Sequence, residues 1–264
     1  MARSQTFSLS DGLALISGAV MVVVFVMRAH HTGYISSITA GVILPIRITV
    51  AFSVVALLVR GVDFSGAVAG SAIAFVLAAH DLRMFWVLLL VFALTLATTR
   101  MGRSRKRQIH AAEASRGRSA SQVMANLGLA GLLVALAPAG WQLLALAALA
   151  EAAADTCSSE VGTAFPGRTV LLTTGKPVNP GIDGGVSLHG TAAAVAAAVL
   201  VALLARVSGL VSTHLALTVV YAGVLGMLLD SLLGALLERQ GYLNNDLVNL
   251  LGTAGAVGIA WGLG

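Results

Sequence analysis

Residues 187–205 read SLHGTAAAVAAAVLVALLA and contain no Asp, Glu, Lys or Arg. A helix needs roughly 17–25 mostly apolar residues to cross a membrane, so this run predicts a membrane-spanning helix. Other stretches share this character, namely residues 12–28, 34–59, 63–79, 83–99, 121–138, 141–157, 209–233 and 246–263. The sequence therefore predicts an all-α, polytopic integral membrane protein with about nine (seven to nine) transmembrane helices, all in one domain covering residues 1–264.

The composition supports this class. Hydrophobic residues make up 58% of the chain, charged residues only 10%, and the mean hydropathy is +0.92. Soluble domains are about 45–50% apolar and about 25% charged, so a soluble globular enzyme is excluded. The single cysteine, Cys157, also excludes an intrachain disulfide and a cysteine metal cluster.

Positive charge is concentrated in one segment. Residues 100–118 read RMGRSRKRQIHAAEASRGR, with seven Lys or Arg and one Glu. Basic loops face the cytoplasm, which predicts a cytoplasmic loop at residues 100–120. The expected location is the cytoplasmic membrane of a prokaryote. With nine crossings, the N-terminus and the loop after residue 158 are cytoplasmic as well. Orientation and contact with anionic membrane lipid explain the charge, and attraction of a nucleotide is the alternative. The run is short and lacks interleaved aromatics, which argues against nucleic acid.

The segment 151–189 reads EAAADTCSSEVGTAFPGRTVLLTTGKPVNPGIDGGVSLH and concentrates carboxylates beside apolar runs. Glu151 and Asp155 are four residues apart on one helix face and would repel unless a cation lay between them. Glu160 follows at the expected helix exit, and Asp230 lies near the end of another span. Such hard oxygen ligands suit Mg²⁺, so these four residues are predicted to be metal ligands. Two alternatives stay open: ion pairs with basic residues, and coupling-ion sites in a transporter.

A glycine-rich loop follows, NPGIDGGVSLHGT at residues 179–191. Gly184 and Gly185 let backbone N–H groups approach a ligand closely, and the start of a helix near Ser187 favours an anion. Ser187 would donate its hydroxyl to the anion or serve as the helix N-cap. Asp183 in this loop makes sense if a metal bridges it to a phosphate. Lys176 would contact a phosphate as a point charge.

Two asparagines, Asn126 and Asn249, stand in otherwise apolar helices. Interhelical hydrogen bonding explains them, and contact with a nucleotide or phosphate is the alternative.

Several motifs occur in order along the chain: RSASQVMAN at 118–126, AAADTCSSEVG at 152–162, TTGKPVNPGIDGGVSLHG at 173–190 and LLDSLLGALLERQ at 228–240. They resemble the membrane family that includes plant and cyanobacterial phytyl phosphate kinase and related proteins of bacteria, archaea and animals. The resemblance covers about residues 63–258. It implies an enzyme, an isoprenyl phosphate kinase-like transferase.

The implied reaction moves a phosphoryl group from a nucleoside triphosphate, with CTP favoured, to an isoprenyl monophosphate such as phytyl or geranylgeranyl phosphate. The expected cofactor is Mg²⁺, and the expected partners are the nucleotide, the isoprenyl phosphate and membrane lipid. The implied catalytic residues are Asp155, Glu160, Asp183, Lys176 and Asp230, and the implied metal ligands are Asp155, Glu160, Asp230 and Glu151. The phosphate-binding set comprises Gly184, Gly185, Ser187, Thr174, Asn126, Asn249 and Arg103. A CTP-dependent lipid nucleotidyltransferase and an ion-coupled transporter are the alternative functions.

Overall fold

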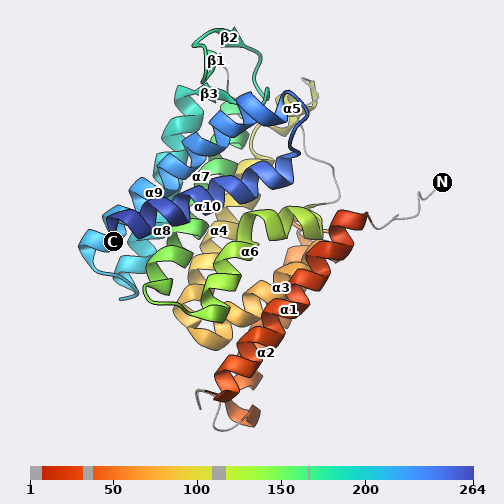
Figure 1. The fold of residues 1–264 in the computed structure, drawn as a ribbon. Helices are drawn as coiled ribbons and strands as arrows, with labels where there is room; N and C mark the ends of the chain where they lie inside the picture. Colours follow the sequence, from red (N-terminus) through yellow and green to blue (C-terminus); the bar gives the residue numbers. More distant parts are fainter. Residues whose placement is uncertain (1–7, 32–37, 109–116, 166) are drawn as a thin grey trace, which may run out of the picture.

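A computed structural model describes residues 8–31, 38–108, 117–165 and 167–264, so part of the predicted basic loop, residues 109–116, lies outside the described residues. The described part is a bundle of long helices (Figure 1). They are α1 (Leu9–His31), α2 (Ile38–Leu58), α3 (Phe64–His80), α4 (Leu82–Arg100), α6 (Ala120–Leu136), α7 (Trp141–Ala164), α8 (Leu188–Val207), α9 (Thr213–Leu233) and α10 (Asn245–Leu263). A short helix α5 (Arg103–Gln108) and a π-helical turn η1 (Gly234–Glu238) complete the helical structure.

Every stretch predicted to span the membrane folds as a helix in the described chain. Five helical segments in that part are long and apolar enough to cross a membrane: α1, α4, α8, α9 continued by η1, and α10. The apolar helices α3 and α6 and the apolar part of α2 (Val42–Leu58) are shorter. The number of crossings therefore stays a prediction.

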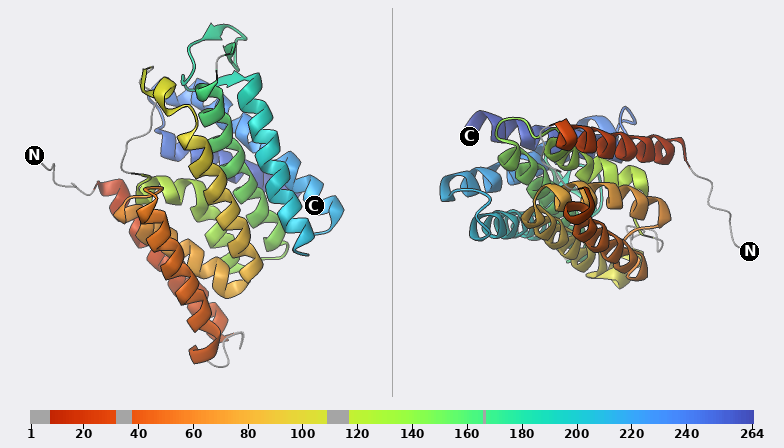
Figure 2. Two further views of the ribbon diagram at one scale, coloured as in Figure 1. Left: turned by 180° about the vertical axis from the view of Figure 1, so that it is seen from behind. Right: turned by 90° about the horizontal axis from the view of Figure 1, so that it is seen from below.

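Helix α7 forms the centre of the bundle. It packs against α4, α6, α8, α9 and α10, and nearly all of its residues from Leu143 to Cys157 are buried (Figures 1 and 2). Many of these residues are alanines, which let neighbouring helices approach closely. A Cβ atom added at Gly223 of α9 would lie 3.0 Å from the Cβ of Ala150. The carboxylates of α7 are therefore held in the middle of the protein.

The segment before α8 is not a simple loop. Strands β1 (Thr169–Leu171), β2 (Pro177–Val178) and β3 (Gly185–Ser187) form an antiparallel sheet in the order β2-β1-β3. The sheet stands at one end of the bundle (Figure 1), and it is the departure from the predicted all-α class. Strand β3 runs directly into α8, where the Ser187 hydroxyl accepts a hydrogen bond from the Gly190 amide at 3.1 Å. Ser187 is thus the N-cap of α8.

Gly184 fixes the sheet to the helices. Its φ of +75° favours glycine, and an added Cβ would lie 2.6 Å from the Cα of Ala235 in η1. Gly175, at the turn between β1 and β2, has a similar φ of +66° but nothing within 4 Å of an added Cβ. The two glycines therefore differ mainly in their contacts.

We expect Gly184→Ala to detach the sheet from η1, while Gly175→Ala bears only the backbone strain that both substitutions share. The clash should add about 1–3 kcal/mol of destabilisation. Limited trypsin digestion at Arg168 measures this, and cleavage should be much faster in Gly184→Ala than in Gly175→Ala. Equal cleavage rates would contradict the close contact with η1.

The first residues of α3 and α6 lie nearer the middle of the bundle than the C-terminal ends of α4 and α7 (Figures 1 and 2). The segments that precede them cross as a short parallel β-bridge between Val62 and Arg118. The Asp63 amide donates to the Arg118 carbonyl at 3.0 Å, and the Arg118 amide donates to the Gly61 carbonyl at 3.2 Å. This crossing forms the floor of a recess beside α7.

At the opposite end of the bundle, Asp81 and Arg83 connect the start of α4 to the turn between α8 and α9. The Arg83 guanidinium pairs with the Asp81 carboxylate and donates to the carbonyls of Ser208 and Gly209 between α8 and α9. Burial raises the pKa of Asp81, but the hydrogen bonds and charge of Arg83 outweigh it, so that the pKa lies below its ordinary value. The stabilisation from ionised Asp81 is therefore complete above its ordinary pKa and is lost as the pH falls through the lower folded value.

Candidate functional site

Three carboxylates meet between α7 and α9. The Asp155 and Asp230 side chains are in hydrogen-bonding contact, and Asp155 also lies within electrostatic range of Glu151. Glu151 is 1% exposed and Asp230 is 9% exposed. Carboxyl groups in contact repel each other when ionised, so a proton or a cation must lie between them. The predicted pairing of Asp155 with Asp230 is present in the structure.

Two oxygen atoms of this cluster stand out. Glu151 Oε1 and Asp230 Oδ2 are buried without a hydrogen-bond partner in the described chain. Both face Gly252 of α10, where an added Cβ would lie 2.8 Å from Glu151 Oε1 and 3.0 Å from Asp230 Oδ2. Unpartnered buried carboxylate oxygens are costly, and a hard divalent cation would satisfy them.

The donor set therefore fits Mg²⁺, which commonly takes one or two carboxylates and completes its shell with water and substrate phosphate. Among the described residues, no group of three or more His, Cys, Asp or Glu side chains is arranged to hold a metal ion. Glu151 and Asp230 would supply the protein oxygens, and Asp155 lies beside them.

Gly252 should be essential to this arrangement. We expect Gly252→Ala to push apart Glu151 and Asp230 and to lower stability by about 1–3 kcal/mol. Gly258 on the same helix has nothing within 4 Å of an added Cβ, so Gly258→Ala should be neutral or stabilising. Thermal unfolding in detergent compares the two. A Gly252→Ala protein as stable as Gly258→Ala would contradict the close approach of α10 to the carboxylates.

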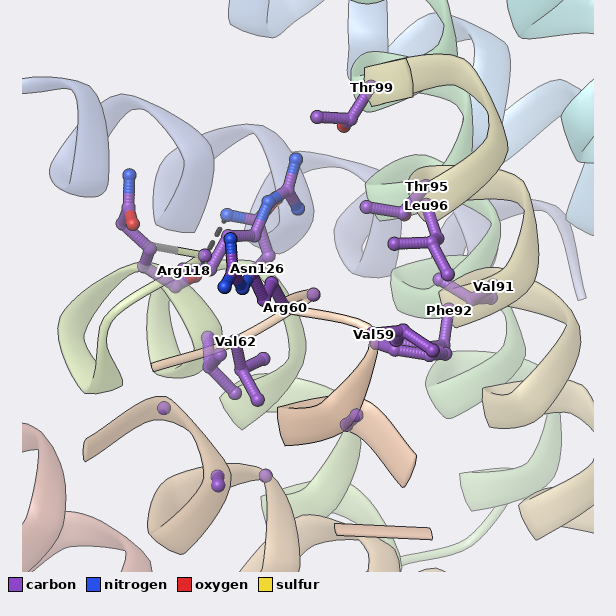
Figure 3. A pocket seen from close by; sticks show the side chains of 18 of the residues that line it. Val59, Arg60, Val62, Val91, Phe92, Thr95, Leu96, Thr99, Arg118 and Asn126 are labelled. Carbon is purple, nitrogen blue, oxygen red and sulfur yellow. Dashed lines mark hydrogen bonds between the residues drawn. The ribbon is translucent and has the colours of Figure 1, made fainter. Parts of the chain in front are cut away.

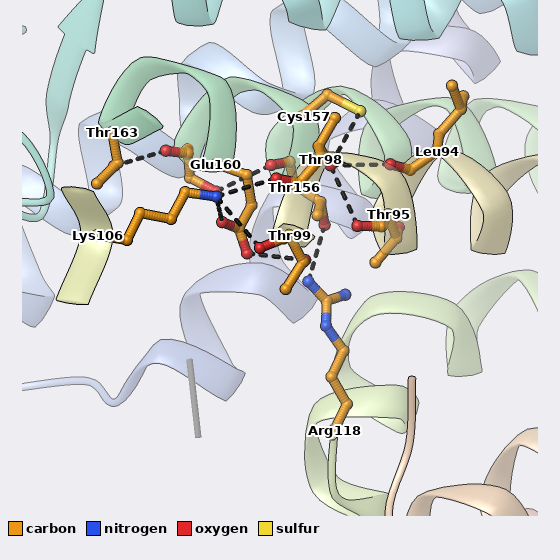
Figure 4. Close-up of polar contacts among 11 residues, drawn as sticks. Leu94, Thr95, Thr98, Thr99, Lys106, Arg118, Thr156, Cys157, Glu160 and Thr163 are labelled. Carbon is orange, nitrogen blue, oxygen red and sulfur yellow. Dashed lines mark hydrogen bonds and ion pairs between the residues drawn. The ribbon is translucent and has the colours of Figure 1, made fainter. Parts of the chain in front are cut away.

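Glu160 lies apart from this cluster. Its carboxylate forms an ion pair with Lys106 of α5 and accepts a hydrogen bond from the Thr99 hydroxyl at 2.8 Å (Figure 4). Lys106 is 1% exposed and also donates to the Thr98 carbonyl at 2.9 Å, at the C-terminal end of α4. Glu160 thus fixes α5 to α4 and α7, and the structure does not place it beside Asp155 and Asp230.

Arg118 connects the two groups. Its guanidinium donates to the Thr156 hydroxyl at 3.5 Å and lies within electrostatic range of Asp155 (Figure 4). A cation at this position offsets part of the negative charge of the cluster.

The glycine-rich loop lies against η1 through Asp183. The Asp183 side chain lies against Gly234 of η1 and within electrostatic range of Glu238. The Gly185 amide donates to the Ile182 carbonyl at 2.9 Å, so this amide serves the turn. Gly184 serves the contact with η1 described above.

The other predicted phosphate contacts are divided between three places. Thr174 and Lys176 are exposed in the hairpin between β1 and β2, which projects from the bundle (Figure 1). Asn249 is half-buried on α10, where its carbonyl accepts a hydrogen bond from the hydroxyl of Thr253, a neighbour of Glu151. Asn126 and Arg103 line a cavity beside α7.

The sequence analysis missed one carboxylate at this end, Glu238. Glu238 lies within electrostatic range of Asp183, Asp155 and Asp246. The signal was present, because Glu238 belongs to the motif at residues 228–240 and follows Asp230 by two helical turns. The π-helical turn between them had no signal in the sequence, and such turns are frequent at functional sites.

A cavity of about 540 Å³ fills the recess above the α3 and α6 starts. Val91, Phe92, Thr95, Leu96 and Thr99 of α4 line one side, and Arg60, Val62, Arg118 and Asn126 line the other (Figure 3). The cationic side chains that line it are Arg60, Arg100, Arg103, Lys106, Arg107 and Arg118. No carboxylate is among its described lining residues.

Comparison with known proteins identifies relatives over most of the chain. The family model described as integral membrane protein DUF92 matches residues 47–257. An uncharacterised membrane protein of Methanocaldococcus jannaschii is 34% identical over 207 residues, covering 76% of this chain and 85% of the relative. An uncharacterised membrane protein of Synechocystis is 36% identical over 195 residues, covering 69% of this chain and 76% of the relative.

A plant relative matches a shorter segment. The chloroplastic protein VTE6 of Arabidopsis thaliana is 37% identical over 100 residues, covering 37% of this chain and 30% of VTE6. No solved structure matches the chain. With a family match over most of its length, the protein belongs to the DUF92 family of integral membrane proteins.

Proposed function

We propose that this protein transfers the γ-phosphoryl group of a nucleoside triphosphate, with CTP favoured, to an isoprenyl monophosphate and forms the isoprenyl diphosphate. The observation that carries the proposal is the contact between Asp155 and Asp230, beside buried, unpartnered oxygens of Glu151 and Asp230. Membership in DUF92 and similarity to VTE6 are consistent with the resemblance to phytyl phosphate kinases.

Phosphoryl transfer depends mostly on positioning and charge neutralisation. Glu151 and Asp230 would hold Mg²⁺, with Asp155 beside them, and the ion would neutralise charge on the nucleotide phosphates. Asp183, in the turn before β3, and Glu238, at the end of η1, are placed to take part in holding the metal–nucleotide complex. Arg118 would orient the phosphate of the acceptor, because its guanidinium is a cation that lies within electrostatic range of Asp155.

The reaction balances without a further reactant. An oxygen of the acceptor phosphate forms a bond to the γ-phosphorus, the bond from this phosphorus to the β,γ-bridging oxygen breaks, and the nucleoside diphosphate leaves. Because the acceptor oxygen is already anionic, the protein needs no strong general base.

Product analysis of the purified protein with Mg²⁺, CTP and geranylgeranyl phosphate tests the proposal. The expected products are CDP and geranylgeranyl diphosphate, identified by mass spectrometry. Pyrophosphate and a CDP-lipid would instead establish a nucleotidyltransferase. Uptake of a solute by proteoliposomes without nucleotide, together with no product from CTP, ATP, GTP or UTP, would establish a transporter.

A further inference from the structure

The cavity beside α7 has two parts whose lining residues differ in chemical character. Cationic side chains from four segments surround its upper part, while Phe52, Ile73, Leu88, Val91 and Phe92 form an apolar lower part. The apolar part is tightly built: the Phe52 and Phe92 rings pack edge to face with centroids 5.1 Å apart. A ligand that fills the whole cavity must therefore carry an anionic end and an apolar end.

Three cations of the upper part, Arg60, Arg103 and Arg107, are available to an anion. Lys106 is held by Glu160, and Arg100 donates to the Val59 carbonyl at 2.6 Å. The side chains of Arg60, Arg103 and Arg107, by contrast, have no hydrogen-bond or ion-pair partner among the described residues. Like charges gathered without a carboxylate repel one another, and a phosphate group would relieve that repulsion.

The lower part discriminates between anionic ligands. A nucleotide base placed there would lose its hydrogen bonds to water without gaining partners from phenylalanine, leucine, isoleucine and valine side chains. An apolar chain would instead gain from burial. The volume of about 540 Å³ lies within the range of small-molecule sites, roughly 300–1,000 Å³.

The cavity also borders the carboxylate cluster. Arg118 lines the cavity and lies within electrostatic range of Asp155, and Ala152 of α7 forms part of the cavity wall between Glu151 and Asp155. An anionic group held by Arg118 would therefore lie on the side of the cavity that faces these carboxylates.

We infer that this cavity is the acceptor site, and that it binds a phosphate monoester with a single apolar chain, the phosphate among Arg60, Arg103, Arg107 and Arg118 and the chain between α2, α3 and α4. That this ligand is the phosphoryl acceptor rests on the proposed function. It separates the two substrates: the lipid enters beside α4, and the nucleotide binds on the side of the sheet and η1.

Photoaffinity labelling tests this assignment without requiring turnover. The probe is a prenyl monophosphate with a benzophenone at the end of its chain, applied to the full protein in detergent without nucleotide. Labelled peptides are identified by mass spectrometry. We expect the label on α2, α3 or α4, with competition by geranylgeranyl phosphate. Label confined to α8, α9 or α10 would overturn the inference.

Matched variants locate the chain and the phosphate. Leu96 lines the cavity, whereas Ala93, three residues earlier on α4, is exposed and does not. Leu96→Trp should lower labelling about tenfold, and Ala93→Trp should leave it unchanged. Arg60→Gln should weaken probe binding about tenfold, while Arg239→Gln, at an exposed position outside the cavity, should not. Equal effects of both members of a pair would contradict the site.

Competitors distinguish a substrate from a bound membrane phospholipid or a free anion. Geranylgeranyl phosphate should compete at lower concentration than dioleoyl phosphatidic acid, inorganic phosphate or geranylgeraniol. If phosphatidic acid competes as well as the prenyl phosphate, the cavity is a phospholipid site and the inference fails. Kinase turnover with labelling elsewhere would overturn this inference alone, whereas cavity labelling without turnover would overturn the proposed function alone.

Discussion

Asp230→Asn is expected to lower nucleotide-dependent turnover more than about 100-fold, because it replaces a carboxylate oxygen that would bind the metal. The same change should leave the free energy of unfolding unchanged or higher, since it removes one charge from a group of carboxyls that repel one another. Loss of activity together with retained stability separates a chemical role from simple misfolding. The measurements are kcat/KM for product formation and the thermal midpoint in detergent.

Asp81→Asn is the matched control, because Asp81 lies at the opposite end of the bundle and pairs with Arg83. It should keep normal turnover but lose up to about 1 kcal/mol of stability, because Asn still caps α4 but no longer pairs with Arg83. The two substitutions should thus act in opposite directions on activity and stability. Normal turnover in Asp230→Asn would remove Asp230 from the site.

Lys106→Met should cause the largest loss of stability. It removes a buried cation and leaves the Glu160 carboxylate, whose side chain is 11% exposed, without its ionic partner. Breaking a buried pair in this way costs about 3–5 kcal/mol. Arg107→Met on the same short helix is the control, because Arg107 is exposed and should contribute little to stability.

The double variant Lys106→Met with Glu160→Met completes the test. Replacing both members of a buried ion pair by apolar side chains of similar size is often neutral, so the double variant should recover most of the lost stability. Thermal unfolding followed by tryptophan fluorescence gives all the values. If the double variant is as unstable as Lys106→Met, the ion pair is not the cause of the loss.

The helices were predictable because each is an apolar run bounded by polar residues. The run at residues 83–99 corresponds closely to α4 (Leu82–Arg100). The span at residues 141–157 was predicted to end there because the carboxylates of Asp155 and Glu160 suggested an exit from the membrane. Helix α7 instead continues to Ala164. The partners of these two carboxylates, Asp230 and Lys106, come from distant parts of the chain.

The sheet had no comparable signal. Its strands are two or three residues long, too short for an alternating pattern, and pairing between them fixes their structure. The cavity could not be predicted from the sequence either, because it depends on where α3 and α6 begin relative to α4 and α7.

Within the site, the shared position of Asp155 and Asp230 was predicted from chemistry, and the structure brings them together. Glu160 could have been separated from them by spacing alone. A step of five residues turns an α-helix by about 140° beyond a full turn, so Glu160 and Asp155 point in different directions. The glycines that admit the carboxylates, Gly226 and Gly252, come from two other helices and needed the structure.

Metal binding is the most direct test that Glu151, Asp155 and Asp230 form the reactive centre. Electron paramagnetic resonance counts Mn²⁺ bound by the purified protein in the presence of CTP, and Mg²⁺ should displace it. We expect about one tightly bound Mn²⁺ per chain in the wild type and in Asp81→Asn, and strongly weakened binding in Asp155→Asn and Asp230→Asn. Undiminished Mn²⁺ binding in both cluster variants would contradict the account.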